Sequence, residues 1–255
     1  MKKTSGNVVE MRGIKLQFGD KVVLESVDVS LQAQEVLVIM GLSGCGKSTL
    51  LSILMGLLKP DAGSALFLGE DVVKLSRPKL NEARTHIGMV YQNAALISSL
   101  DVHDNIGLPL RELTDKSSKE IDEIIDQKPE LVGLTDVMDK LPSELSGGMQ
   151  KRVGLARALV MDPELVLFDE PSAGLDPVNS KLIDDLIVHL RDQEKVTSIV
   201  VTHEMESAFT VATRMAFLHE GKMILEGTPE AFRDSENPTI RDFLSPHAKQ
   251  ENAKR

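Results

Sequence analysis

The sequence predicts an α/β fold with a mostly parallel core sheet, and three observations support that prediction. A glycine-rich stretch at residues 41–48 follows the apolar run 36–40 and precedes leucines at helical spacing. Two later runs, 165–168 and 198–201, are apolar apart from Ser198, as strands buried on both faces are. Between them, apolar residues at helical spacing from 182 to 190 indicate a helix. A helix between two buried strands forms a βαβ unit, which favours parallel pairing.

The N-terminal third predicts a second, antiparallel layer. Residues 22–31 alternate between apolar and polar side chains, as a strand with one buried face does. Residues 7–16 are β-like but less regular, and a short β run at 65–68 follows a Pro-Asp-Ala-Gly turn. We therefore expect an N-terminal antiparallel β subdomain beside the glycine-rich loop.

The middle of the chain predicts a helical subdomain at about residues 95–160. From Val102 to Met161 the sequence is helical and rich in charge, without a convincing strand. Pro129 is expected to end or kink one of these helices after Lys128.

The whole chain, residues 1–255, is expected to form one domain, because no internal repeat or low-complexity linker divides it. The last predicted strands form a hairpin at residues 215–225, which turns at Glu220 and Gly221. The residues at about 246–255 are predicted to be a polar tail.

Composition excludes several classes of function. The net charge of −10 argues against a general nucleic-acid surface, so no nucleic-acid partner is expected. No run approaches the roughly 20 apolar residues that a membrane span needs, and the first six residues are not followed by an apolar signal core. A single cysteine excludes an internal disulfide and fits a reducing compartment.

The octet from Gly41 to Ser48 fits the phosphate-binding pattern G-x-x-x-x-G-K-[ST]. A strand, a glycine loop and a helix in this order direct backbone N–H groups and a helix N-terminus at polyphosphate. Lys47 is expected to reach the β- and γ-phosphates, and the Ser48 hydroxyl to complete a Mg²⁺ shell. A chance glycine turn is the alternative, and the flanking strand and helix argue against it. The motif predicts binding of a nucleoside triphosphate.

Two acidic residues stand at the end of the buried strand 165–168. Asp169 is expected to support Mg²⁺ through water. Glu170 is placed to orient or deprotonate an attacking water. The alternative for this pair is a solvated strand end.

A third element is the run Leu145 to Arg152, in which Ser146, Gly147 and Gly148 open a helix. Such an opening presents backbone N–H donors outward. Taken alone, the run is more typical of an ordinary helix cap than of a binding site.

Six motifs occur in the order found in one family, and the chain resembles the ATP-binding subunit of an ABC transporter from about residue 8 to 245. The matches are Walker A at 41–48, the Q-loop glutamine Gln92, the signature at 145–149, Walker B at 165–170, the D-loop at 172–176 and the switch histidine His203. Met149 departs from the glutamine usual in the signature. Phe18 falls where the family places an aromatic residue that stacks on adenine, with core packing as its alternative role.

The resemblance implies catalytic roles for Glu170, His203 and Gln92, and Mg²⁺ contacts for Ser48, Gln92 and Asp169. The residues that it assigns to ATP are Phe18, Gly41, Leu42, Ser43, Gly44, Cys45, Gly46, Lys47, Ser48, Thr49, Ser146, Gly147, Gly148 and Asp176. Cys45 has no paired histidine in the sequence pattern, so nucleophilic catalysis by its thiol is not expected. Its place at a helix N-terminus favours thiolate.

The resemblance also implies partners. A head-to-tail homodimer would bring Ser146 of one copy to the ATP held by the glycine loop of the other. Integral-membrane permease subunits would be separate polypeptides. The apolar, small stretch 93–100 is expected to border the groove that receives a permease helix.

Finer matches at residues 92–96, 104–112, 144–152 and 238–244 are similar to the ATPases of Mla/MCE phospholipid-transport systems. This likeness implies phospholipid transport between inner and outer membranes, an MCE-domain lipid-binding partner and a peripheral position on the cytoplasmic face of a bacterial inner membrane. Two alternatives stay open. One is the ATPase of an importer for methionine or another polar solute. The other is a soluble, non-transport ABC ATPase, which would be expected to carry two cassettes or a long coiled-coil insertion.

Overall fold

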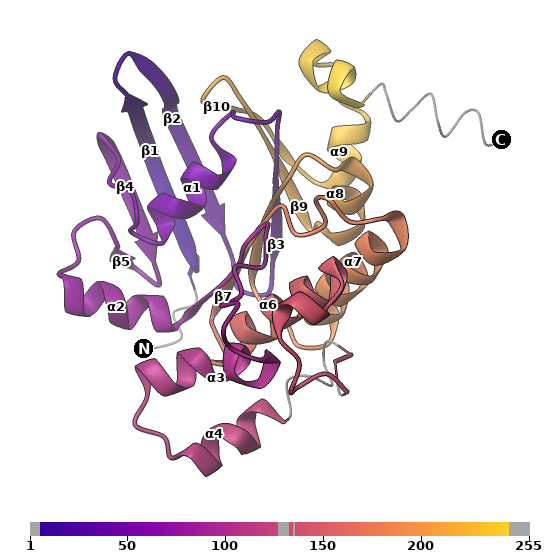
Figure 1. Cartoon of the computed structure of the whole chain (residues 1–255). Coiled ribbons are helices and arrows are strands. Elements are labelled where there is room, and N and C mark those ends of the chain that lie inside the picture. The colour runs from indigo at the N-terminus through magenta and orange to yellow at the C-terminus, as the bar shows by residue number, and fades with distance from the viewer. Residues whose placement is uncertain (1–5, 127–132, 135, 245–255) are drawn as a thin grey trace.

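The computed structural model of the chain describes residues 6–126, 133–134 and 136–244. The kink expected at Pro129 and the polar tail at 246–255 therefore lie outside the described residues. Two sheets with helices around them organise this part of the chain, which confirms the predicted α/β fold (Figure 1).

The core sheet of the described residues has six strands in the order β10-β9-β3-β8-β7-β6. Their bounds are β3 Val36–Met40, β6 Ile87–Val90, β7 Leu165–Asp169, β8 Ser198–Thr202, β9 Arg214–His219 and β10 Lys222–Gly227. Neighbouring strands pair in parallel, except that β10 forms the predicted antiparallel hairpin with β9. Strands β3 and β8 are buried along their whole length, which explains the apolar run 36–40 in β3 and the apolar centre 199–201 of β8.

The second sheet is antiparallel, as predicted, with the order β2-β1-β4-β5. Its strands are β1 Val9–Phe18, β2 Lys21–Leu31, β4 Ala62–Phe67 and β5 Glu70–Asp71. Strand β3 shows how the two layers share the core sheet. Val36, Val38 and Met40 pack into the cluster formed with the helices, whereas Leu37 and Ile39 pack into the cluster formed with the antiparallel sheet. This alternation follows from the two-residue period of a strand.

The helices are α1 Lys47–Leu54, α2 Arg77–Thr85, α3 Val102–Leu113, α4 Ser118–Ile125, α6 Gly147–Leu159, α7 Pro177–Asp192, α8 Met205–Val211 and α9 Pro229–Arg233, with a short 3-10 turn η1 at Pro142–Glu144. Helices α3 and α4 lie together below the sheets in Figure 1, and α6 to α9 lie on the side of the core sheet away from β1 and β2. Within the described ranges, no helix combines the length and apolar character that a bilayer span requires.

Three local features differ from the sequence expectation. The leucine pattern predicts a helix that continues to residue 58, but α1 ends at Leu54 because Gly56 turns the chain with φ 62° and leaves Leu57 exposed. Helix α2 was not predicted, since it is polar and buries only Ala83. Strand β6 was also missed, because its four residues are too few to show a period.

Candidate functional site

The glycine loop joins the end of β3 to the start of α1, as the motif predicts. Gly41 and Gly46 both adopt positive φ, at 154° and 108°. A Cβ at Gly41 would lie 2.2 Å from the carbonyl oxygen of Leu218, and a Cβ at Gly46 would lie 2.9 Å from the side chain of Leu24. Glycine is needed at both positions because the loop passes between the two sheets without room for a side chain.

Lys47 folds back over this loop. Its Nζ donates hydrogen bonds to the carbonyl oxygens of Gly41, at 2.9 Å, and Leu42, at 3.2 Å. The side chain is only 5 % exposed, and its Nζ lies 3.5 Å from Oε1 of Glu170. A buried cation bound by carbonyls and one carboxylate is held at a fixed position at the base of the loop.

Strand β7 places Asp169 beside the start of α1. The Ser48 hydroxyl donates to Oδ1 of Asp169 at 2.7 Å. Burial raises the pKa of Asp169, and the hydrogen bond from Ser48 partly opposes that rise. A hydroxyl and a carboxylate that converge in this way supply the oxygen ligands that Mg²⁺ prefers, so the donor set fits the predicted ion.

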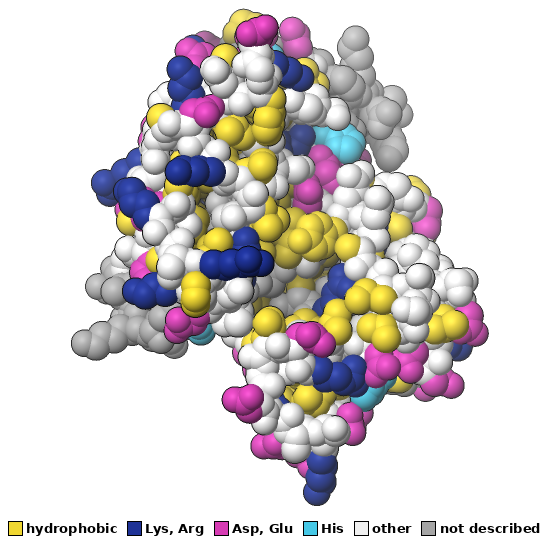
Figure 2. Space-filling view, turned by 60° about the vertical axis from the view of Figure 1, so that its left-hand side comes forward, with side chains coloured by type: hydrophobic (Ala, Val, Ile, Leu, Met, Phe, Trp, Pro, Cys, Tyr) yellow, Lys and Arg dark blue, Asp and Glu magenta, His cyan; other side chains and the backbone are white. Residues whose placement is uncertain are grey.

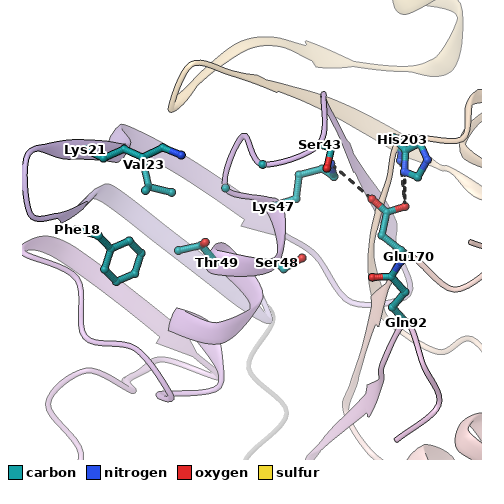
Figure 3. Close-up of a pocket in the computed structure, with 12 residues that line it drawn as sticks. Phe18, Lys21, Val23, Ser43, Lys47, Ser48, Thr49, Gln92, Glu170 and His203 are labelled. Atoms are coloured by element: carbon teal, nitrogen blue, oxygen red, sulfur yellow. Dashed lines mark hydrogen bonds and ion pairs between the residues drawn. The ribbon is translucent and has the colours of Figure 1, made fainter.

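Glu170 follows with a strained backbone. Its φ is 49°, a left-handed value that is rare for a residue other than glycine and typical of functional sites. Oε2 accepts a bond from the backbone N–H of His203 at 3.3 Å and lies 2.8 Å from Nδ1 of the same residue. Figure 3 shows this carboxylate between Lys47 and His203, facing the pocket.

Lys47, Ser48, Glu170 and His203 line one pocket of about 400 Å³, whereas Asp169 is not part of its lining. Its walls are Phe18, Lys21, Val23, Ser43, Gly44, Gly46, Lys47, Ser48, Thr49, Gln92, Glu170 and His203 (Figure 3). Phe18 is 54 % exposed, which excludes the alternative that it fills the core. Lys21 and Val23 were not predicted; they enter because β2 starts beside Phe18, and the two-residue Gly19-Asp20 turn between the strands is the sequence signal that could have revealed this pairing.

Gly41, Leu42 and Cys45 belong to the glycine loop but are not among the residues that line the pocket. Cys45 is half-buried, and its surroundings correct one expectation. Burial raises the pKa of its thiol, and the Lys47 charge and nearby backbone N–H groups only partly lower it again. The thiol form is favoured here, because desolvation outweighs the electrostatic effect of the helix N-terminus.

Ser146, Gly147, Gly148 and Asp176 lie outside this pocket. Ser146 caps α6, and its hydroxyl accepts from the backbone N–H of Met149 at 3.3 Å. Asp176 caps α7 in the same manner, accepting from the backbone N–H groups of Val178 and Asn179. The structure therefore shows Ser146 and Asp176 as helix caps. Both residues are exposed, and both lie outside the pocket that Lys47 lines within the same chain.

Lys151 links the signature helix to the D-loop and was not predicted. Its buried Nζ donates to the carbonyl oxygens of Pro171, at 2.7 Å, and Ala173, at 2.6 Å. Burial lowers the pKa of this lysine, and the charges of Glu204 and Glu170 oppose that effect. Helix α6 and the segment after Glu170 are thus tied together by one cation.

A smaller groove of about 280 Å³ lies between α2, β6, α3 and α6. It is lined by Arg84, Thr85, Ile87, Gly88, Met89, Tyr91, Leu108, Pro109, Leu113, Arg157, Ala158 and Met161. Figure 2 shows one face of the molecule on which hydrophobic side chains gather along a hollow between a lower lobe and the larger body. Of the apolar stretch predicted beside such a groove, Ile97 is exposed, whereas Leu96 is half-buried and packs against the core.

Comparison with known proteins gives consistent results. A family profile described as "ABC transporter" matches residues 24–173. The chain is 42% identical over 240 residues to the "Probable ribonucleotide transport ATP-binding protein mkl" of Mycobacterium leprae, covering 94% of this chain and 69% of that protein. It is 38% identical over 238 residues to the "Intermembrane phospholipid transport system ATP-binding protein MlaF" of Haemophilus influenzae, covering 93% of this chain and 90% of that protein.

Among solved structures, the chain is similar to the ATP-binding cassette MJ0796, described as a dimer in a post-hydrolysis state bound to ADP and phosphate. The two share 30% sequence identity and superpose with a TM-score of 0.79, over 87% of this chain and 98% of that one.

Proposed function

This chain belongs to the ABC transporter family of ATP-binding proteins and is an ATPase, and we propose that it drives phospholipid transport between bacterial membranes. The observation that carries this proposal is its likeness to MlaF over nearly the full length of both proteins. The identity to mkl is slightly higher but covers 69% of that protein, so ribonucleotide transport is the second candidate.

ATP would lie in the pocket of about 400 Å³, with its adenine against the exposed ring of Phe18 and its phosphates in the glycine loop. Lys47 would meet the β- and γ-phosphates. Because its Nζ also lies 3.5 Å from Glu170, the γ-phosphate and that carboxylate would share one buried cation. This arrangement keeps Glu170 close to the phosphate that is removed.

Mg²⁺ would be held by Ser48 and Gln92, with Asp169 in support, since their oxygen atoms suit this ion. When bound, it supplies positive charge that offsets the charge on the transferred phosphoryl group. Burial favours the protonated form of Asp169, and the bond from Ser48 favours its ionised form.

Hydrolysis would use Glu170 as the group that orients the attacking water and accepts its proton. His203 would fix the carboxylate, because both its backbone N–H and its Nδ1 lie within hydrogen-bond distance of Oε2. Gln92 would form another part of the same pocket wall; Figure 3 draws its side chain below Glu170, with His203 above.

A homodimer would complete each site. Ser146 and Gly147 are exposed at a helix N-terminus outside the pocket of their own chain, so they can serve the ATP of a second copy, whereas Gly148 is buried against Asn179. Asp176 would lie at the same interface. The similar cassette MJ0796 is described as a dimer with ADP and phosphate bound, which supports this arrangement.

Permease subunits of the inner membrane would dock from the cytoplasmic side into the groove of about 280 Å³. Apolar side chains are exposed in this groove, among them Leu113, which is 55 % exposed, and Tyr91, which is 39 % exposed. Tyr91 precedes Gln92 in the sequence, so an occupant of the groove would lie next to the nucleotide pocket. An MCE-domain lipid-binding protein would be a further subunit of the assembly.

Affinity purification of the tagged chain from detergent-solubilised membranes tests the proposal. We expect an integral-membrane permease and an MCE-domain protein in the eluate. Leu113→Glu should abolish their recovery, whereas Leu182→Glu, an exposed apolar site on α7 outside the groove, should leave it unchanged. Recovery of a periplasmic solute-binding protein, or of ribosomes, would contradict phospholipid transport. Full recovery with Leu113→Glu would exclude the groove.

A further inference from the structure

The loop after Gln92 turns through two consecutive left-handed alanines. The φ angles are 56° at Ala94 and 48° at Ala95. Alanine disfavours this region because its Cβ crowds the following carbonyl oxygen. Two such residues in succession persist only where their surroundings hold them, and strained segments of this kind concentrate at functional sites.

Arg157, on the helix that begins at the signature, holds this turn. Its Nη1 donates to the carbonyl oxygen of Ala95 at 2.9 Å, and its Nη2 donates to the carbonyl oxygen of Ala94 at 2.7 Å. The guanidinium is planar with donors in a fixed fork, so it binds two successive carbonyls only when both point the same way. The left-handed turn brings the two carbonyls into that arrangement.

The contact between the loop and α6 leaves little freedom. Ala94 is 2 % exposed. Gly154 lies three residues before Arg157 and so on the same helical face. A Cβ at Gly154 would lie 3.3 Å from the carbonyl oxygen of Ala94, which shows that the two backbones pack directly against each other.

We propose that Arg157 is a positioning residue for ATP hydrolysis: it holds Ala94 and Ala95 in the left-handed turn and thereby fixes Gln92 at the wall of the nucleotide pocket. The inference rests on the proposed role of Gln92 in that pocket. One helix then joins the Gln92 loop to the signature, because Ser146 caps the same helix about 16 Å from Arg157. A shift of the Gln92 loop is therefore transmitted along this helix to Ser146, at the surface proposed to meet the ATP that a second copy holds.

A purely stabilising role for Arg157 makes a different prediction. Loss of two hydrogen bonds from a part-buried side chain would lower the unfolding temperature, whatever the loop conformation. If instead Arg157 acts by holding the turn, a glycine at position 95 should substitute for it in part, because glycine adopts positive φ without the steric penalty of alanine. Position 95 is suitable because its side chain is exposed, so the change leaves no cavity.

The experiment compares purified full-length chains in a steady-state ATPase assay without permease. Arg157→Met should lower kcat about tenfold while the affinity for a fluorescent ATP analogue changes less than about twofold. Ala95→Gly alone should be close to wild type. The double variant Arg157→Met with Ala95→Gly should recover at least about threefold in kcat over Arg157→Met.

Arg191→Met is the matched control, because Arg191 also donates to a backbone carbonyl, that of Val211, far along the chain from the Gln92 loop. It should leave kcat unchanged. Unchanged kcat in Arg157→Met would overturn the proposal, and so would a loss of kcat that Ala95→Gly does not restore. Glu170→Gln in the same assay tests the proposed catalytic chemistry separately. If this variant still hydrolysed ATP, the role of Glu170 would be wrong whatever the result for Arg157→Met.

Discussion

Nδ1 of His203 lies 2.8 Å from Oε2 of Glu170, although 33 residues separate them in sequence. The contact arises from strand pairing. Asp169 at the end of β7 pairs with Val201 near the end of β8, so the residues that follow both strands meet at one edge of the core sheet. Lys47, at the start of α1, approaches the other carboxylate oxygen of Glu170 from the glycine loop.

Glu170→Gln should stop hydrolysis and retain ATP binding. The carboxamide keeps the shape of the side chain but cannot accept a proton from water, so kcat should fall by at least about a hundredfold. Turnover and nucleotide binding, measured on the same preparation, check this. Lys47→Ala is the contrasting variant, in which binding itself should be lost. Near-normal turnover in Glu170→Gln would show that another group is the base.

Ser146→Arg should lose hydrolysis while each isolated chain still binds ATP. Ser146 lies outside the pocket formed by its own chain, so a bulky side chain there affects only the nucleotide of a second copy. Mixed dimers of this variant with Lys47→Ala provide a sharper test, because one of their two composite sites contains neither substitution. Activity restored on mixing supports the head-to-tail dimer; failure of folded Ser146→Arg monomers to bind ATP contradicts it.

Cys45 should react slowly with a maleimide, and bound MgATP should protect it. Burial raises the pKa of its thiol, so the reactive thiolate forms less readily than in a free cysteine. The rate of labelling should therefore rise steeply as pH is raised towards 9. Labelling should inhibit the ATPase, and Cys45→Ser should be active and insensitive. Equal labelling rates with and without MgATP would place the thiol away from the phosphates.

Asp184→Asn should stabilise the protein at neutral pH. Asp184 is 8 % exposed, and burial raises its pKa to about 6 in the folded chain, with the charges of Glu204 and Asp185 adding to the effect. The hydrogen bond from Ser207 and the charge of Lys181 oppose it. The folded state thus retains a proton that the unfolded state releases, so stability falls as pH rises from about 4 to 6.

The asparagine variant does not titrate and can still accept the hydroxyl of Ser207. It should be more stable than wild type by roughly 2 kcal/mol at pH 7.5, and the difference should vanish near pH 4. Thermal unfolding across this pH range measures the effect. A difference that is constant with pH would mean that Asp184 has the same pKa in the folded and unfolded states.

The sequence by itself determined the elements whose pattern is local. Apolar runs identified β3, β7 and β8, because strands buried on both faces consist mainly of apolar residues. The glycine loop was evident because close backbone approach to phosphate requires glycine at fixed spacing. Strand β6 and helix α2 were missed, since four residues show no period and a polar surface helix shows no apolar stripe.

Only the tertiary structure decided how distant residues meet. The carboxylate of Glu170 lies between Lys47 and His203 because β3, which leads into the glycine loop, ends at the same edge of the sheet as β7 and β8, and strand order is not encoded in any local pattern. Burial raises the pKa of the Cys45 thiol, although its place at a helix N-terminus predicted a thiolate. Desolvation depends on which atoms surround the thiol, and only the tertiary structure determines these. The hydrogen bonds from Arg157 to the carbonyls of Ala94 and Ala95 also depend on the tertiary structure. They join segments more than 60 residues apart, and backbone carbonyls carry no sequence signature.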